Sequence, residues 1–371
     1  MILLATGFAV AQEDAARQQL RRAVELQQAG DYPAAIAAYR EFLKSYPDVA
    51  PVRSNLGAAL AHEGRYREAV EEYTKALAAD PKNTGIRLNR ALAYYKTGNI
   101  VQATQEFKTV YAMMPAADPN RERVALLLGE CYLRQGQNKQ VEDLLDPLAA
   151  QGLQDRALIY VLGTALLREG QTDRGAQLID QLLRNGDSAE AHMLMAYTRM
   201  KASDKSGAIK EVDQAIALNP HLAEAYSLRG RLAFLETDLK GAEQWFRKSL
   251  EVDENEFDAQ LWLGTLLREE GQYPEAEQHL AHALELQPGE IRARYQYAHA
   301  ISDQGDDKRA ATLLETLIKD HPEYTEAYRT LATIYFRLGR PEDGRRERKL
   351  AEEMDAAIRQ RNEDRGRSMT K

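Results

Sequence analysis

Histidines that could hold a metal ion are the first candidates for chemistry in this sequence. His279 and His282 are three residues apart, a spacing at which two helical side chains can bind one ion, and His299 follows. The three fall on different layers of the fold predicted below, and no carboxylate at a further helical spacing completes a ligand set. We therefore expect ordinary solvated helix histidines and no metal site.

The sequence also lacks a recognisable set of catalytic residues. Cys131, the single cysteine, lies between Gly129 and Tyr132 in an apolar stretch and is predicted to be a small core thiol. Adjacent acids such as Glu71-Glu72 point apart on a helix. The sequence contains no phosphate-binding glycine loop, no nucleophile elbow and no zinc-protease motif. We expect a protein that is not an enzyme and that needs no cofactor.

Composition narrows the class of partner. The 371 residues are 44% hydrophobic and 29% charged, with a net charge of −8, which argues against nucleic-acid binding. Residues 251–300 carry 3 basic and 11 acidic side chains, so this stretch accounts for the imbalance. No run of about 18 apolar residues is present, so no membrane insertion is expected.

The first residues resemble a leader. Residues 1–11 are apolar and uncharged, and Ala9-Val10-Ala11 has the small-x-small form of a signal-peptidase site, although no basic residue precedes Arg17. We interpret residues 1–11 as a signal-peptide remnant of an exported or periplasmic protein. The alternative is a cytoplasmic protein in which this segment packs on the first helix.

A period of 34 residues organises the rest of the chain. Glycines recur at positions 30, 64 and 98, and prolines at 47, 81 and 115. The second copy reads Leu56-Gly57, Leu60, Gly64, Tyr66, Ala69, Tyr73, Ala76 and Pro81. This pattern resembles the tetratricopeptide repeat (TPR) family, and its continuation gives about ten copies between Ala16 and Met354. Glycine fills the same slot at 136, 170, 271, 305 and 339, and Ser203 and Thr237 replace it in two copies.

The resemblance implies an all-α TPR solenoid, a superhelix of stacked antiparallel helix pairs, and the spacing of apolar residues agrees. Apolar residues recur at helical spacing in each first half, as at Ile159, Leu162 and Leu166. Glycine then ends the first helix, and proline stops the second. A single pair cannot bury its apolar face, so neighbouring pairs must stack. Because two helices cross closely at Gly264, we expect Gly264→Leu to destabilise by about 1–3 kcal/mol.

Departures from the pattern suggest an irregular region. Arginine replaces the usual leucine at Arg22, Arg90 and Arg229, so these copies bury less or bend the arginine outward. Residues 118–121 are an insertion. In the next copy, Val141 occupies the position where a small residue belongs, and Pro147 lies inside the predicted second helix. We expect a soft boundary near 116–121 that separates repeats 1–3 (16–115) from repeats 4–10 (122–354). A continuous array with one irregular turn is the alternative.

The C-terminal segment is strongly charged. Residues 355–371 are predicted to form a polar cap helix followed by a disordered tail from 366, because terminal repeats need a polar outer face. A nucleic-acid patch is the alternative reading of the preceding run Arg345-Arg346-Glu347-Arg348-Lys349. Acidic residues alternate with those arginines, which favours the cap.

A second stripe on the first helices is the candidate binding site. By resemblance to the family, this stripe lines the concave side, where TPR proteins commonly hold peptide segments. In copies five to seven it presents large side chains that the core does not require: Tyr160, Leu167, Met193, Tyr197, Met200, Arg231 and Phe234. We expect a groove for a helical or extended segment. The alternative is that these residues pack against each other.

The acidic stretch 251–258 is a second candidate, for a basic partner, although acids before a helix also favour its dipole. The leading function is a non-enzymatic scaffold or adaptor that binds a protein or peptide segment in the concave groove. A module that recruits substrates for a separate enzyme, such as a glycosyltransferase or an envelope assembly machinery, is one alternative. A self-assembling structural protein is the other. On the groove hypothesis, Tyr197→Glu or Phe234→Ser should abolish binding and preserve helicity.

Overall fold

The computed structural model describes residues 2–150, 155–184 and 186–369, with side chains from 14 to 360 within these ranges. This part of the chain contains helices and no strand, so the predicted all-α class is confirmed. The helices are α1 Ile2–Gln28, α2 Tyr32–Ser45, α3 Ala50–His62, α4 Tyr66–Ala79, α5 Thr84–Lys96, α6 Ile100–Met113, α7 Arg121–Arg134, α8 Asn138–Ala150, α9 Arg156–Arg168, α10 Thr172–Arg184, α11 Ala189–Lys201, α12 Lys205–Leu218, α13 Ala223–Leu235, α14 Leu239–Val252, α15 Phe257–Glu269, α16 Tyr273–Leu286, α17 Ile291–Asp303, α18 Asp307–Asp320, α19 Thr325–Arg337 and α20 Pro341–Met369.

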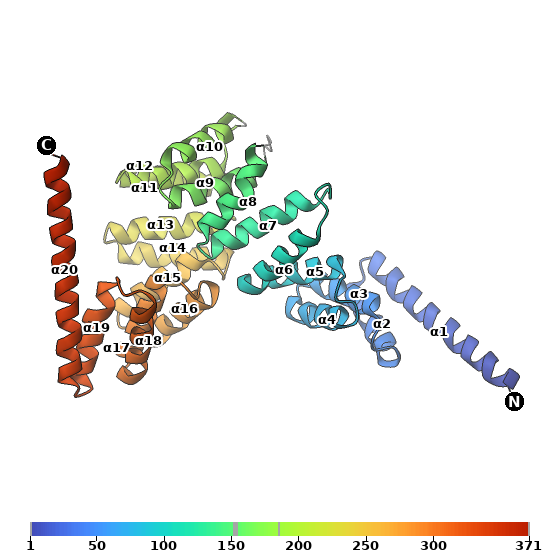
Figure 1. The fold of residues 1–371 in the computed structure, drawn as a ribbon. Coiled ribbons are helices and arrows are strands. Elements are labelled where there is room, and N and C mark those ends of the chain that lie inside the picture. Colours follow the sequence, from blue (N-terminus) through green and yellow to red (C-terminus); the bar gives the residue numbers. More distant parts are fainter. Residues whose placement is uncertain (1, 151–154, 185, 370–371) are drawn as a thin grey trace. The chain divides into compact units, whose positions relative to one another are not determined.

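The chain divides into two compact units, Met1–Glu169 and Gly170–Lys371. Within each unit, consecutive helices pack as pairs, and each pair packs on the next (Figure 1). The boundary predicted near 116–121 lies inside the first unit, between α6 and α7, and these two helices pack on each other. The boundary there stays a prediction.

The insertion before α7 forms an ordered turn. Asp118 accepts a hydrogen bond from the Asn120 amide at 2.8 Å. Arg121 donates from Nη1 to the carbonyls of Tyr111 and Met114 and stacks its guanidinium on the Tyr111 ring at 3.9 Å. These bonds fasten the extra residues to the end of α6.

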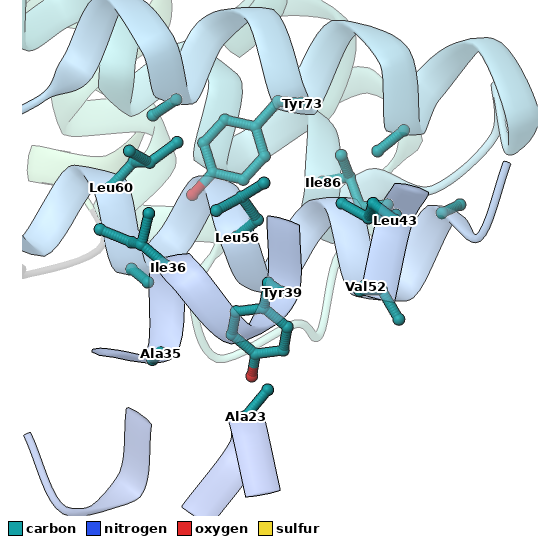
Figure 2. Close-up of a cluster of buried hydrophobic side chains, with 14 of the residues drawn as sticks. Ala23, Ala35, Ile36, Tyr39, Leu43, Val52, Leu56, Leu60, Tyr73 and Ile86 are labelled. Atoms are coloured by element: carbon teal, nitrogen blue, oxygen red, sulfur yellow. The ribbon is translucent and has the colours of Figure 1, made fainter. Parts of the chain in front are cut away.

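Each core is built from several successive pairs. In the first unit, Ala23 of α1, Tyr39 of α2, Leu56 of α3, Tyr73 of α4 and Ile86 of α5 belong to one buried cluster. Figure 2 shows the Tyr73 ring beside Leu56. Because no single pair supplies this cluster, stacking is what buries the apolar stripes, as the sequence predicts.

The close helix crossings also match the expected register. A Cβ atom added to Gly57 would lie 2.7 Å from the Tyr73 ring, and one added to Gly230 would lie 2.6 Å from Phe246. In the fourth copy Gly129 leaves this room for Leu145, and Val141 is fully buried. Glycine is therefore required where the second helix places a large side chain over the first.

Pro147 lies within α8, which ends at Ala150. At the C-terminus, α20 packs on α19 and continues to Met369, four residues into the segment predicted to be disordered. At the other end, the leader-like segment is part of α1 from Ile2 onward, and its side chains lie outside the described residues. No helix in the described residues is both long and apolar enough to cross a bilayer.

The turn between the two helices of each repeat uses left-handed backbone. Glycine has a positive φ in this slot in eight copies, and Ser203 and Thr237 have φ of 62° and 63° in the other two. The sequence register therefore identifies all ten turns. A β-branched residue is strained in this conformation, because its Cβ approaches the carbonyl oxygen.

We expect Thr237→Gly to stabilise the protein by about 0.5–1 kcal/mol, because relief of the left-handed strain exceeds the entropic cost of glycine. Urea unfolding followed by circular dichroism measures the change. The reverse exchange in the next copy, Gly271→Thr at φ 79°, is the matched control and should cost about 1–2 kcal/mol. A loss of stability in Thr237→Gly would contradict the assigned strain.

Two of the three unusual arginines are held by acids. Arg90 bonds Glu106 through Nη2 at 2.5 Å, and Arg229 bonds Asp213 through Nε at 3.0 Å. Arg229 also lies over the Trp245 ring at 5.4 Å. Arg22 is exposed. The leucine position thus becomes an ion pair in the third and seventh copies, whereas in the first copy the arginine lies outside the core.

Candidate functional site

The first helices of the second unit each have a side that faces away from the second helices. Each of α13, α15, α17 and α19 packs on its own second helix, on the second helix before it and on neighbouring first helices. The side of α11, α13, α15, α17 and α19 that faces away from the second helices is called the inner face below.

Three of the predicted binding residues are buried. Tyr160 is 8% exposed, Leu167 1% and Met193 0%. At these positions the alternative reading, packing between repeats, describes the structure. Side chains so deeply buried offer little surface to a partner.

The other four predicted residues are half-buried, and all lie in the second unit. Tyr197 and Met200 belong to α11, and Arg231 and Phe234 belong to α13. The Tyr197 hydroxyl donates a hydrogen bond to the Glu224 carboxylate at the start of α13. This bond connects two successive repeats across the inner face.

An aromatic residue that the sequence analysis did not select extends this surface. The Phe234 ring lies 5.5 Å from the ring of Trp262 on α15, measured between centroids. The Arg292 guanidinium of α17 lies 4.9 Å from the centroid of the same Trp262 ring. Trp262 is half-buried and packs against the core formed by α13, α14 and α15.

A polar cluster lies further along the inner face. Arg268 of α15 donates from Nη1 to Asp303 at 3.1 Å, and the same nitrogen lies 3.0 Å from His299 Nδ1. Its Nε atom is buried and has no hydrogen-bond partner. The cluster joins α15 to α17, and one donor of its guanidinium has no acceptor.

Burial raises the pKa of two side chains near this surface, Glu290 and Tyr324. Burial raises the pKa of the Glu290 carboxyl, which caps α17 and accepts a hydrogen bond from the Ala293 amide. Burial also raises the pKa of the Tyr324 hydroxyl to about 12. Tyr324 and Tyr295 pack edge to face, with ring centroids 5.5 Å apart. Tyr324 therefore stays protonated near neutral pH and acts as a packing group.

In the first unit, a buried acid joins two first helices. The Tyr95 hydroxyl of α5 donates to Glu130 of α7 at 2.9 Å. Burial raises the pKa of the Glu130 carboxyl. Tyr95 and Glu130 belong to the first helices of the third and fourth copies, so this hydrogen bond joins two successive repeats.

The candidate chemical groups have structural partners. His279 Nδ1 lies 2.6 Å from Gln260 Oε1, and His282 Nε2 lies 3.0 Å from Asn255 Oδ1. Cys131 is fully buried, and burial raises the pKa of its thiol to about 12, as expected for a core thiol and not a nucleophile. Within the described ranges no group of three metal-binding side chains comes together.

Two acids of the stretch 251–258 stabilise local backbone structure. Glu256 caps α15 by accepting a hydrogen bond from the Ala259 amide at 2.6 Å. Asp253 accepts one from the Asn255 amide at 3.0 Å in the preceding turn. Capping and turn formation thus account for part of this run. A basic partner there stays a hypothesis.

Comparison with known sequences identifies the repeats. One tetratricopeptide repeat model matches residues 20–84, 193–256 and 298–347, and a second matches 60–115 and 267–322. Together they cover more than half of the chain. No curated protein matches the sequence.

One solved structure supports the fold, and two more resemble the chain less closely. The APC/C hetero-tetramer Cut9–Hcn1 is 13% identical, with a TM-score of 0.54, over 92% of this chain and 82% of that one. The TPR protein YrrB, described as having an unusual peptide-binding site, is 20% identical over 47% of this chain and 91% of its own, with a TM-score of 0.41. Yeast Tom70 is 16% identical over 94% and 97%, with a TM-score of 0.37. The matched models, the ten turns in one register and the successive helix pairs show that the chain belongs to the tetratricopeptide repeat family.

Proposed function

We propose that this protein is a non-enzymatic scaffold whose inner face in the second unit binds a segment of another protein. TPR repeats generally serve in protein–protein interaction, and the family models that match are repeat models. The observation that carries the proposal is the apolar surface at the end of α13. Half-buried Phe234, one side of which packs against the core of α13, α14 and α15, is followed by Leu235, which is 44% exposed.

Phe234→Ser is expected to abolish capture of the partner by the full chain. The half-buried ring packs against Trp262 and the neighbouring core, so its loss should cost about 2 kcal/mol of stability and leave the helical spectrum intact. Affinity purification from the native organism, compared with circular dichroism of each variant, measures both effects. Tyr197→Glu is less suitable, because it would place a second carboxylate near Glu224.

Leu218→Ser is the matched control. Leu218 is 46% exposed at the end of α12, a second helix. Its replacement therefore removes exposed apolar surface that does not belong to the inner face. The proposal requires one protein that is lost with Phe234→Ser and retained with Leu218→Ser. Identical captures by wild type and Phe234→Ser would refute it.

We also propose that the protein works outside the cytoplasm. The support is the apolar segment 1–11 with its Ala9-Val10-Ala11 sequence. Fractionation of the native organism with N-terminal sequencing tests this. A mature chain that begins near Gln12 in the exported fraction supports it, and an uncleaved chain in the cytoplasm contradicts it.

A further inference from the structure

Arg231 is an arginine without a counter-charge on the inner face. It lies half-buried on the third turn of α13, and within the described part of the chain no hydrogen bond or ion pair engages its guanidinium. Other arginines of the same unit behave differently, since Arg229 bonds Asp213 and Arg247 bonds Glu275. A partly desolvated guanidinium carries five N–H donors, and leaving them unused costs free energy.

The neighbouring inner helices also have more donors than acceptors. On α15, Arg268 bonds Asp303 through Nη1, its Nη2 lies 3.8 Å from Glu269 Oε1, and its buried Nε has no partner. On α17, Arg292 is stacked on Trp262 and forms no ion pair within the described residues. Three successive repeats thus present guanidinium groups whose hydrogen-bonding capacity exceeds what the chain supplies.

We infer that the segment bound by this face is acidic, with an Asp or Glu side chain on Arg231 and an adjacent apolar side chain against Phe234 and Leu235. Carboxylates match the planar, bidentate donor geometry of arginine better than any other protein side chain. The apolar residue accounts for the exposed Leu235 beside the charge. This inference rests on the proposed function and adds the chemistry of the partner.

A random library of 12-residue peptides displayed on phage, selected against the full chain, provides the test. We expect selected peptides to be enriched in Asp and Glu next to an apolar residue. A synthetic copy of the best peptide should lose about tenfold or more in affinity with Arg231→Gln, and binding should weaken as NaCl rises. Arg231→Lys keeps the charge but loses the planar fork, so its affinity for the peptide should lie between those of the wild type and Arg231→Gln.

Arg67→Gln is the matched control, because Arg67 is an exposed arginine of α4 in the other unit, and it should bind as the wild type does. Peptides that require Phe234 but show no acidic enrichment, or that bind Arg231→Gln at full strength, would overturn the inference and leave the proposed function standing. Acid-enriched peptides that bind Phe234→Ser as tightly as the wild type, or a selection that enriches no peptide, would overturn both the inference and the proposed function.

Discussion

Glu106→Ala is expected to lower the free energy of unfolding by about 3–5 kcal/mol, because it leaves two largely buried arginines without an acid. Arg87 bonds Glu106 at 3.0 Å and Arg90 bonds it at 2.5 Å. The three side chains are only 20%, 14% and 14% exposed, and the Nε atoms of both arginines already have no partner. Urea unfolding monitored by circular dichroism measures the loss.

Two variants make this prediction specific. Glu71→Ala removes an exposed acid of α4 and should change stability by about 0.5 kcal/mol at most. Arg90→Leu restores the residue usual in the family and leaves Arg87 to pair with Glu106, so it should be close to neutral or stabilising. If Glu106→Ala were as stable as Glu71→Ala, the ion pairs would contribute nothing to the fold.

Gly264→Leu is expected to cost about 3 kcal/mol, at the top of the range for overpacked cores. A Cβ atom at Gly264 would lie 2.7 Å from Leu280 Cγ and 3.2 Å from the Ala276 carbonyl oxygen. The side chain could rotate, but the carbonyl belongs to the backbone of α16, so the two helices must move apart. Thermal or urea unfolding of the purified variant measures the effect.

Gly289→Leu serves as its control. Gly289 lies in the turn between α16 and α17, and a Cβ atom there would have no heavy atom within 4 Å. Its replacement should stay within about 0.5 kcal/mol of wild type. Equal stability of the two leucine variants would show that the crossing at Gly264 is looser than the geometry indicates.

Much of the fold could be read from the sequence because the repeat fixes local geometry. The 34-residue register identifies the left-handed turns, including Ser203 and Thr237, and the close crossings at Gly230 and Gly264. Arg90 shows a limit of this reading. The register marks its replacement of leucine, but the partner Glu106 is on the next helix, and no local pattern indicates that the two will pair.

The candidate site was predicted less completely, and the reason is physical. Helical periodicity tells which side of a helix a residue occupies, but not how closely the next repeat approaches that side. Tyr160 and Met193 share the stripe with Phe234, yet the first two are buried and Phe234 is only half-buried. Trp262 and Arg292 complete the surface from two further repeats, so their proximity to Phe234 depends on the angle between helix pairs.

Packing between near neighbours has a consequence for how this protein responds to a ligand. In the second unit the helices pack on partners one or two places along the chain, so stability is carried by a row of local interfaces, as in a one-dimensional Ising chain. A segment bound across α13 to α17 adds its binding energy to the interfaces that it spans, and distant pairs gain little. The ends of the row can therefore fray or vary while the central pairs keep their recognition surface.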